Sequence, residues 1–448
     1  MLVVEAIMLV TQQGRLGTRV KFGYYPTLIA AASAIACLAF QANAVVPAQF
    51  GAATNFATAP GPRNMAVGDF NHDGHLDLAV TAGNGVVSVL LGRGHGTFAA
   101  PINFSVLGSQ PITAADFNND GDLDILACPV VLLGDGTGSF PVRTNLNGYF
   151  SYATSVAVAD FNCDGNLDLA IPSDNGSVAV LSGRGDGSFT TATNLQLAFN
   201  ASGNVRAGDI SGRGKTDLVV SLWGYPYTNC FCVFSNKGDG SFGVPIYYSL
   251  RKTNSLGSLL PIAHPSLELG DFRANGQVDL AVLNRDISPS GSNSFTIWTN
   301  GGRQNFSPMF EYTLGFPPTS IAVLLYGNGD GSFTMGTQMS LPSVKAFAAE
   351  DFDSNGTPDL AFANYASNCV AIMLNQTPPI LQLTPVVGYN QINWLNSFGA
   401  GFVLEYTTNL DLPGSWQPFP YPPVLLGNQK AVTDWTSGDR KFYRLRKP

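Results

Sequence analysis

Oxygen-bearing side chains recur at fixed spacing in one short segment of the chain, residues 69–77. Positions one, three, five and nine of this segment are filled by Asp69, Asn71, Asp73 and Asp77. Ca2+ prefers oxygen ligands at this spacing, and a glycine at position six, here Gly74, allows the sharp turn that wraps the backbone around the ion. With the backbone carbonyl of His75 as a further ligand at position seven, the segment is predicted to hold Ca2+.

Near copies of the segment occur at five further places in the chain. Three of them keep an oxygen ligand at every position, with the residue at position seven free to offer its backbone carbonyl. Their predicted Ca2+ ligands are Asp116, Asn118, Asp120, Asp122 and Asp124; Asp160, Asn162, Asp164, Asn166 and Asp168; and Asp351, Asp353, Asn355, Thr357 and Asp359. We expect the other two copies, residues 209–217 and 271–279, to be empty turns, because Arg213 and Arg273 stand where a ligand belongs. The alternative is that every copy is only a turn stabilised by Asp and Asn side chains.

Short apolar runs rich in β-branched residues flank each copy, which predicts strands rather than helices on both sides of the loop. Each full unit contains four such runs, and in the first unit they cover residues 64–70, 76–82, 86–91 and 97–104. Four antiparallel strands in a repeat of about 45 residues are typical of one blade of a β-propeller. The chain is therefore predicted to be all-β.

The spacing of the copies predicts the number of blades. The first three intervals between their leading aspartates are 47, 44 and 49 residues, whereas the interval from Asp271 to Asp351 is 80 residues. Within that long interval, residues 318–323 are typical of an opening strand and residues 324–333 of the close of a unit, with no loop or second strand between them. We therefore expect seven blades, the sixth of them cut down to about half. A right-handed or irregular β-solenoid is the alternative architecture.

The two ends of the repeat array are complementary. The last unit stops near Asn375 without a fourth strand, and residues 50–56 have the pattern of a fourth strand without a blade. We expect this N-terminal strand to complete the last blade and close the propeller, which would hide the strand edges of an open array.

The repeated pattern Asp-Phe-Asn-x-Asp-Gly-x-x-Asp-Leu-Ala-Val, followed by Leu-Leu-Gly-x-Gly-x-Gly-x-Phe, resembles the FG-GAP/VCBS repeat family, whose relatives include the propeller of integrin α-subunits. The resemblance covers about residues 50–377. It implies a propeller over residues 45–377 with structural Ca2+ on the hairpins between the first two strands of each blade, on one face of the disc. The two copies with arginine and the shortened sixth unit depart from the family pattern.

The first 44 residues are predicted to be an export signal. Basic residues at Arg15, Arg19 and Lys21 precede an apolar run over residues 27–40, and Ala42-Asn43-Ala44 ends it. This run is short for a membrane span. We expect the mature protein to be secreted or displayed at the cell surface, with no membrane span. Attachment as a lipoprotein through Cys37 is the less favoured alternative.

A second pattern begins after Pro378-Pro379, and residues 378–448 are predicted to form a small β-sandwich. Thr407-Thr408-Asn409-Leu410, followed by Trp416 and a closing Phe442-Tyr443-Arg444-Leu445, is similar to C-terminal fibronectin-III/Ig-like modules of exported bacterial proteins. The side chains predicted to fill its core are Trp394, Trp416 and Trp435.

The composition favours binding over catalysis and argues against a nucleic-acid partner. The net charge is −8 with no basic stripe, only four histidines are present, and no serine-hydrolase or zinc-protease motif occurs. The expected function is a non-enzymatic scaffold for an extracellular protein or glycan; the alternative is a polysaccharide lyase or hydrolase on the same fold. Aromatic residues that would favour glycan binding are Trp223, Tyr225 and Tyr227, whereas a cluster of basic residues and tyrosines would favour the enzyme.

Overall fold

The computed structural model describes residues 6–11, 35–36, 49–106, 111–146, 153–173, 176–198, 202–222, 230–250, 262–273, 275–286, 294–313, 321–327, 332–340, 343–355, 357–376, 382–386, 389–395, 403–408, 415–426, 429–435 and 441–446. Every regular element in these residues is a β-strand, which confirms the all-β prediction. Among them there is no helix long and apolar enough to cross a membrane.

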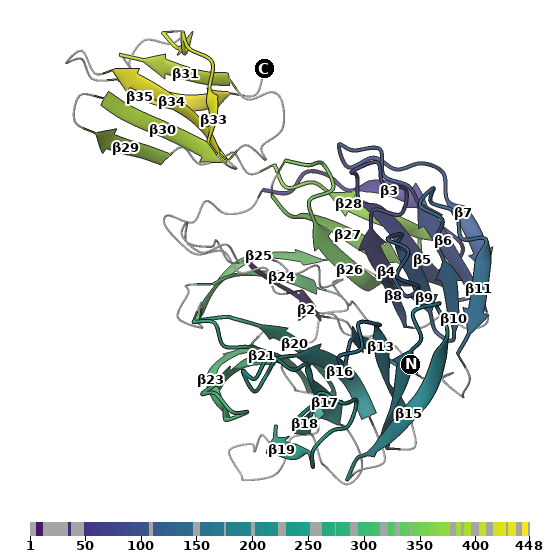
Figure 1. Cartoon of the computed structure of the whole chain (residues 1–448). Coiled ribbons are helices and arrows are strands. Elements are labelled where there is room, and N and C mark those ends of the chain that lie inside the picture. Colours follow the sequence, from purple (N-terminus) through teal and green to yellow (C-terminus); the bar gives the residue numbers. More distant parts are fainter. Residues whose placement is uncertain are drawn as a thin grey trace.

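The repeating unit is a four-stranded antiparallel sheet (Figure 1). The strands of sheet 1, in spatial order, are β4 (Pro62–Gly68), β5 (Asp77–Ala82), β6 (Val86–Leu90) and β7 (Ile102–Ser105). All six residues of β5 are buried, so its side chains are covered on both faces of the sheet. By contrast, three of the four residues of β7 are exposed, as expected for the outermost strand.

Sheets 2 to 5 repeat this order. Sheet 2 contains β8 (Ile112–Ala115), β9 (Asp124–Ala127), β10 (Val130–Leu133) and β11 (Val142–Asn145). Sheet 3 contains β12 (Ala157–Ala159), β13 (Asp168–Ser173), β14 (Ser177–Gly183) and β15 (Phe189–Gln196). Sheet 4 contains β16 (Ser202–Gly208), β17 (Asp217–Leu222), β18 (Cys230–Phe234) and β19 (Ile246–Ser249). Sheet 5 contains β20 (Ile262–Gly270), β21 (Asp279–Asp286), β22 (Ser294–Asn300) and β23 (Phe306–Thr313).

The hydrophobic core lies between neighbouring sheets. One cluster joins Ala79 and Val89 of sheet 1 to Ile125 of sheet 2, and similar clusters join sheets 2 and 3, 3 and 4, and 4 and 5. Because each middle strand contributes side chains to the clusters on both of its faces, the sequence of these strands is almost continuously apolar. This explains why they show no strict alternation of polar and apolar residues.

Sheet 6 differs from the predicted half unit. Residues 318–323 are predicted as an opening strand separate from the close of the unit, but β24 runs without a break over Ile321–Gly327 and pairs with β25 (Phe333–Ser340). The pair Gly327 and Phe333 matches Gly183 and Phe189, which join the third and fourth strands of sheet 3. The prediction of an opening strand is therefore wrong, because this unit keeps its last two strands. Short apolar runs bounded by turn residues look alike in the first and third strands.

The missing side of sheet 6 is occupied by the start of the chain. Strand β1 (Ala6–Thr11) pairs with β24 in parallel, and β2 (Ile35–Ala36) pairs with β1, giving the order β2-β1-β24-β25. Both strands fall within the segment predicted as an export signal, most of which lies outside the described residues.

Sheet 7 contains residues from both ends of the repeat array. Its strands β26 (Val344–Glu350), β27 (Asp359–Asn364) and β28 (Cys369–Met373) are joined at the outer edge by β3 (Thr54–Ala57). In Figure 1 the purple β3 lies beside the green β28, and the two strands pair antiparallel. The N-terminal strand therefore completes the last sheet at the predicted place. A hydrophobic cluster also packs Met65 and Phe98 of sheet 1 against Phe352 and Val370 of sheet 7.

Two further sheets form after residue 381. One contains β29 (Gln382–Val386), β30 (Tyr389–Leu395), β34 (Gln429–Trp435) and β33 (Val424–Leu426), and the other contains β32 (Gln417–Pro418), β31 (Val403–Thr407) and β35 (Phe442–Arg446). One small cluster joins them, with Ile392 and Val432 from the first sheet and Leu404 from the second.

Two of the three tryptophans predicted to fill the core of this C-terminal region lie outside its core cluster. Trp435 is 68% exposed and Trp416 is only half-buried, while the side chain of Trp394 lies outside the described residues. The core consists instead of the smaller aliphatic side chains, with Phe419 and Tyr443 packed against them.

Candidate metal sites on the repeat hairpins

Each copy of the nine-residue segment forms the hairpin between the first two strands of its sheet. After the sheets that carry them, the copies are called loops 1, 2, 3, 4, 5 and 7; they cover residues 69–77, 116–124, 160–168, 209–217, 271–279 and 351–359. In loop 1, β4 ends one residue before Asp69, and β5 begins at Asp77. Position nine is therefore the first residue of a strand, and the preceding positions form the turn.

The aspartate at position nine connects two turns of the same sheet. Asp77 is fully buried, and its two carboxylate oxygens accept hydrogen bonds from the backbone amides of Phe70, at 2.7 Å, and Gly92, at 2.6 Å. The second bond ties the hairpin to the turn that joins the third and fourth strands. The same pair of backbone bonds is made by Asp124, Asp168 and Asp359. Spacing alone predicts a ligand here, whereas the structure adds a role as a structural clip.

The other oxygen-bearing side chains surround the turn itself. Asp69 accepts hydrogen bonds from the amides of Asp73, at 3.2 Å, and Gly74, at 2.9 Å, and Asn71 accepts a second bond from the Asp73 amide, at 3.2 Å. In loops 1, 2 and 3, positions one and three are half-buried, and position five is exposed. The predicted ligands of each loop thus extend from the buried strand end to the solvent.

The backbone conformation of the loops also follows the sequence pattern. Gly74 has a φ of +81°, in the left-handed region that glycine adopts without a steric penalty. Position four adopts the same region although it is not glycine, with a φ of +56° at His72 and +61° at Cys163. This twist turns the side chain at position four away from its own loop.

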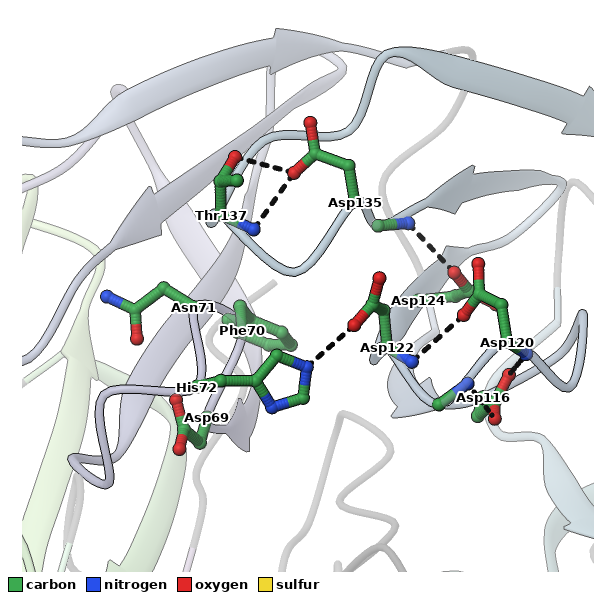
Figure 2. Close-up of polar contacts among 12 residues, drawn as sticks. Asp69, Phe70, Asn71, His72, Asp116, Asp120, Asp122, Asp124, Asp135 and Thr137 are labelled. Carbon is green, nitrogen blue, oxygen red and sulfur yellow. Dashed lines mark hydrogen bonds and ion pairs between the residues drawn. The ribbon is translucent and has the colours of Figure 1, made fainter.

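Neighbouring loops contact each other through positions four and seven. The ring Nε2 of His72 lies 2.6 Å from the carboxylate of Asp122 in the next loop (Figure 2). Between loops 2 and 3, the side-chain amide of Asn119 donates to the oxygen of Asn166 at 2.8 Å. The bond to Asp122, aided by the charges of Asp122 and Asp69, raises the pKa of His72 although burial opposes the shift. The position-seven side chains of Asp122 and Asn166 therefore bridge adjacent loops, which leaves their backbone carbonyls as the possible ligands.

Electrostatics in four of the loops favour a bound cation. Burial raises the pKa of Asp77, Asp124 and Asp168 to about 6 and that of Asp359 to about 7. For Asp77, the nearby charges of Asp73 and Asp69 raise the pKa as well, whereas the amides of Gly92 and Phe70 lower it. Clustered carboxylates that disfavour each other's ionisation fit a divalent cation, which would compensate their charge.

Loop 7 brings its carboxylates closest together. Oxygens of Asp351, Asp353 and Asp359 all lie within 4.8 Å of one another, and Asn355 and Thr357 follow in the same turn. This loop differs from the other three in having Asp at position three and Asn at position five. At positions one, three, five and nine it still carries three carboxylates, as the other three loops do. The oxygen-only donor set is the type that Ca2+ prefers.

Arginine side chains occupy the corresponding space in loops 4 and 5. Arg273 contacts both carboxylate oxygens of Asp279, at 3.0 and 2.7 Å, and Arg213 contacts Asp217 at 3.3 Å. The bond to Asp279 is the main cause that raises the pKa of Arg273. The sequence predicts that these loops lack a metal, and the contacts of the arginines could not be deduced from their spacing.

Further residues of the repeat array take part in turns or in the core, or fall outside the described residues. Among the described residues, Cys128, Cys230, Cys232 and Cys369 are buried and Cys163 is exposed, and none of the five forms a disulfide. In the Arg-Gly-Asp tripeptide of sheet 3, Asp186 accepts a bond from the Ser188 amide at 2.9 Å, within a turn. The aromatic residues proposed for glycan binding, Trp223, Tyr225 and Tyr227, lie outside the described residues.

Comparisons with known proteins support the repeat assignment. A family model described as FG-GAP-like repeat matches residues 69–127 and 164–220, so the chain carries FG-GAP-like repeats at these two places. No curated protein matches the chain at a significant level. Among solved structures, two crystal structures of BBS1N in complex with ARL6DN, one soaked with mercury and one with lead, each match with 11% identity and a TM-score of 0.38. Each match covers 74% of this chain and 98% of that chain.

Proposed function

We propose that the chain is an exported, calcium-binding β-propeller of seven blades that acts as a non-enzymatic scaffold for binding an extracellular protein or glycan. The FG-GAP-like repeats and the series of four-stranded sheets support the propeller. The completion of sheet 7 by β3 and the cluster shared by sheets 1 and 7 support its closure into a ring.

The observation that carries the calcium proposal is the repetition of one oxygen-lined turn in loops 1, 2, 3 and 7. Each turn has a fully or almost fully buried aspartate at position nine and further oxygen-bearing side chains at its solvent side. In loop 7 three carboxylates converge within 4.8 Å. Ca2+ in these four turns would neutralise the carboxylates and hold each hairpin in place, so its contribution would be to stability.

The scaffold role follows from the arrangement of the loops. Hydrogen bonds between loops 1 and 2 and between loops 2 and 3 join them into one continuous rim. Rigid loops on a packed scaffold are the usual place for a binding surface. The fold itself does not specify the ligand, so the choice of a protein or a glycan partner depends on the rim residues. Export is supported by the N-terminal sequence pattern, and removal of that segment would leave sheet 6 with β24 and β25 alone.

A metal count combined with thermal unfolding tests this proposal. The purified chain is expected to hold four Ca2+ and to unfold at a clearly lower temperature after chelation, because four clusters of carboxylates would lose their counter-ion. Replacement of Asp120 by alanine should remove one Ca2+. Replacement of Asp135, an exposed aspartate outside the loops, should leave the count at four.

Binding to panels of extracellular proteins and glycans, with Ca2+ and with a chelator, then tests the scaffold role. Calcium-dependent binding without turnover of the bound glycan would support it. A chain that holds no Ca2+ and unfolds at the same temperature with and without chelator would refute the calcium proposal.

A further inference from the structure

Loop 5 contains an arginine at a position where the oxygen-only loops carry a predicted ligand. The guanidinium of Arg273, at position three, donates to both oxygens of the buried Asp279, at 3.0 and 2.7 Å, and to the backbone carbonyl of Asn300 at 2.8 Å. Its side chain is only 22% exposed. The cation is thus held between the strand end and the turn that joins the third and fourth strands, where Asn300 lies.

Loop 4 contains a similar arginine that starts from a different position. Arg213, at position five, donates to the hydroxyl of Ser211 at 2.7 Å, to Asp217 at 3.3 Å and to the carbonyl of Asn236 at 3.4 Å. Its side chain is 48% exposed, so its contacts are looser than those of Arg273. Two arginines at different sequence positions therefore reach the same two kinds of partner, the aspartate at position nine and the carbonyl of the opposite turn.

The aspartate at position one holds the turn in these two loops as it does in the oxygen-only loops. Asp271 accepts bonds from the amides of Asn275, at 3.0 Å, and Gly276, at 2.6 Å, as Asp69 does in loop 1. In loop 4, Asp209 accepts the corresponding bonds at 2.9 and 2.7 Å. These two turns thus share the position-one contacts of the oxygen-only loops and differ in carrying an arginine at position three or five.

We propose that Arg213 and Arg273 are built-in counter-ions that replace Ca2+, so that sheets 4 and 5 are independent of calcium while sheets 1, 2, 3 and 7 depend on it. The inference rests on the proposed calcium binding and extends it, because it assigns a calcium ion to four loops and an arginine side chain to the other two. A buried carboxylate is stable only when it is paired or bound to a metal. The planar guanidinium suits this role because its fork of donors can reach a carboxylate and a carbonyl together.

The proposal predicts that a calcium site can be restored by one substitution. Arg273→Asp would give loop 5 the side chains Asp, Asp, Asn and Asp at positions one, three, five and nine, the same set as loop 7. Arg213→Asp would give loop 4 the set Asp, Ser, Asp and Asp. The wild-type chain is expected to hold four Ca2+, each single variant five, and the double variant six. Arg143→Asp, an equal change of charge on the outer strand β11, should leave the count at four.

Several outcomes would overturn the proposal. A wild-type chain with six Ca2+ would show that the arginines do not exclude the ion. A folded Arg273→Asp variant that still binds four Ca2+ would show that loop 5 cannot bind the ion even without its arginine. Should that variant fail to fold, Arg273→Asn tests whether loop 5 binds Ca2+ without its arginine. This substitution places at position three the residue found in loops 1, 2 and 3.

A second measurement separates this inference from the calcium proposal itself. In excess chelator, Arg273→Ala should lower the midpoint of thermal unfolding, because Asp279 would lose its buried partner, whereas Arg143→Ala should not. If the wild-type chain holds no Ca2+ but Arg273→Ala is destabilised, the calcium proposal fails and the counter-ion role stands. If Arg273→Ala unfolds like the wild type in chelator, the counter-ion role is refuted whatever the metal count.

Discussion

The backbone amide of Gly96, in sheet 1, donates a hydrogen bond of 3.0 Å to the carbonyl of Phe352, in loop 7. The same bond joins consecutive units elsewhere, from Gly138 to Phe70 at 2.9 Å and from Gly187 to Phe117 at 3.1 Å. Phenylalanine rings repeat the relationship, because Phe98 meets Phe352 edge to face at 5.9 Å, as Phe140 meets Phe70 at 5.7 Å. The contact between the last and the first unit is thus built like the contacts between successive units.

A side chain at Gly96 should weaken that contact. Gly96 has a φ of +68°, and a Cβ there would lie 2.5 Å from a methyl group of Leu374. The left-handed conformation alone costs an alanine about 1–2 kcal/mol. We expect Gly96→Ala to lower the free energy of unfolding by at least that amount in denaturant titration. Gly212→Ala, at a φ of +67° with no atom within 4 Å of the added Cβ, is the matched control and should lose only the cost of the left-handed conformation. Equal stability of the two variants would contradict the proposed closing contact.

The clip role and the ligand role of the loop aspartates can be separated. Asp124 is fully buried and holds two backbone amides, so Asp124→Ala should destabilise the chain by about 2–4 kcal/mol even in chelator, because both amides lose their partner. Asp120 is exposed, so Asp120→Ala should change stability little in chelator. Denaturant unfolding with and without Ca2+ distinguishes the two roles. A similar loss for both variants in chelator would contradict the distinction.

The stability of the calcium-free chain should fall as the pH rises. Burial raises the pKa of Asp77, Asp124 and Asp168 to about 6 and that of Asp359 to about 7, above the unfolded value of about 3.9. The folded chain therefore binds more protons than the unfolded chain between about pH 4 and pH 7, and the free energy of unfolding decreases with pH across this window. Thermal unfolding in chelator at a series of pH values measures the trend. Excess Ca2+ should reverse it, because the ion binds the deprotonated carboxylates.

Chelation should loosen the sheets unequally. Backbone amides around loops 1, 2, 3 and 7 should exchange hydrogen faster without Ca2+, whereas those around loops 4 and 5 should keep their protection, because Arg213 and Arg273 remain in place. Hydrogen exchange followed by mass spectrometry measures both groups in one experiment. A uniform increase over all six loops would contradict the assignment of calcium to four of them.

Much of this architecture can be predicted from the sequence, because the loop pattern marks where the second strand of each unit begins. The aspartate at position nine coincides with the first residue of the second strand in all six copies. The strand that completes sheet 7 is also predicted, since its pattern lacks a unit of its own. In sheets 1 to 5 and 7, the repeat pattern is therefore sufficient to predict which segments form strands and to which sheet each strand belongs.

The features that the sequence does not reveal depend on contacts distant in the chain. The bond from Asp77 to Gly92 links two turns, and the reach of Arg273 to Asn300 depends on how those turns face each other. The apolar pattern of residues 318–333 does not distinguish a first strand from a third, so the half unit is misassigned. Trp435 is predicted in the core of the C-terminal region, but it is 68% exposed, and the cluster that joins the two C-terminal sheets contains Ile392, Leu404 and Val432.

The pairing of β3 with β28 sets an order of events during synthesis. Thr54 lies opposite Ile372 in sheet 7, so its strand leaves the ribosome more than three hundred residues before its partner. Sheets 1 to 5 can form as their own residues emerge, since each is made from adjacent strands. Sheets 6 and 7 are the exceptions, since β1 also pairs with the distant β24, and contacts of such long sequence separation form slowly. The final step of folding must therefore wait for nearly the whole repeat array, and a chain cut short before residue 369 would keep β3 as an unpaired edge.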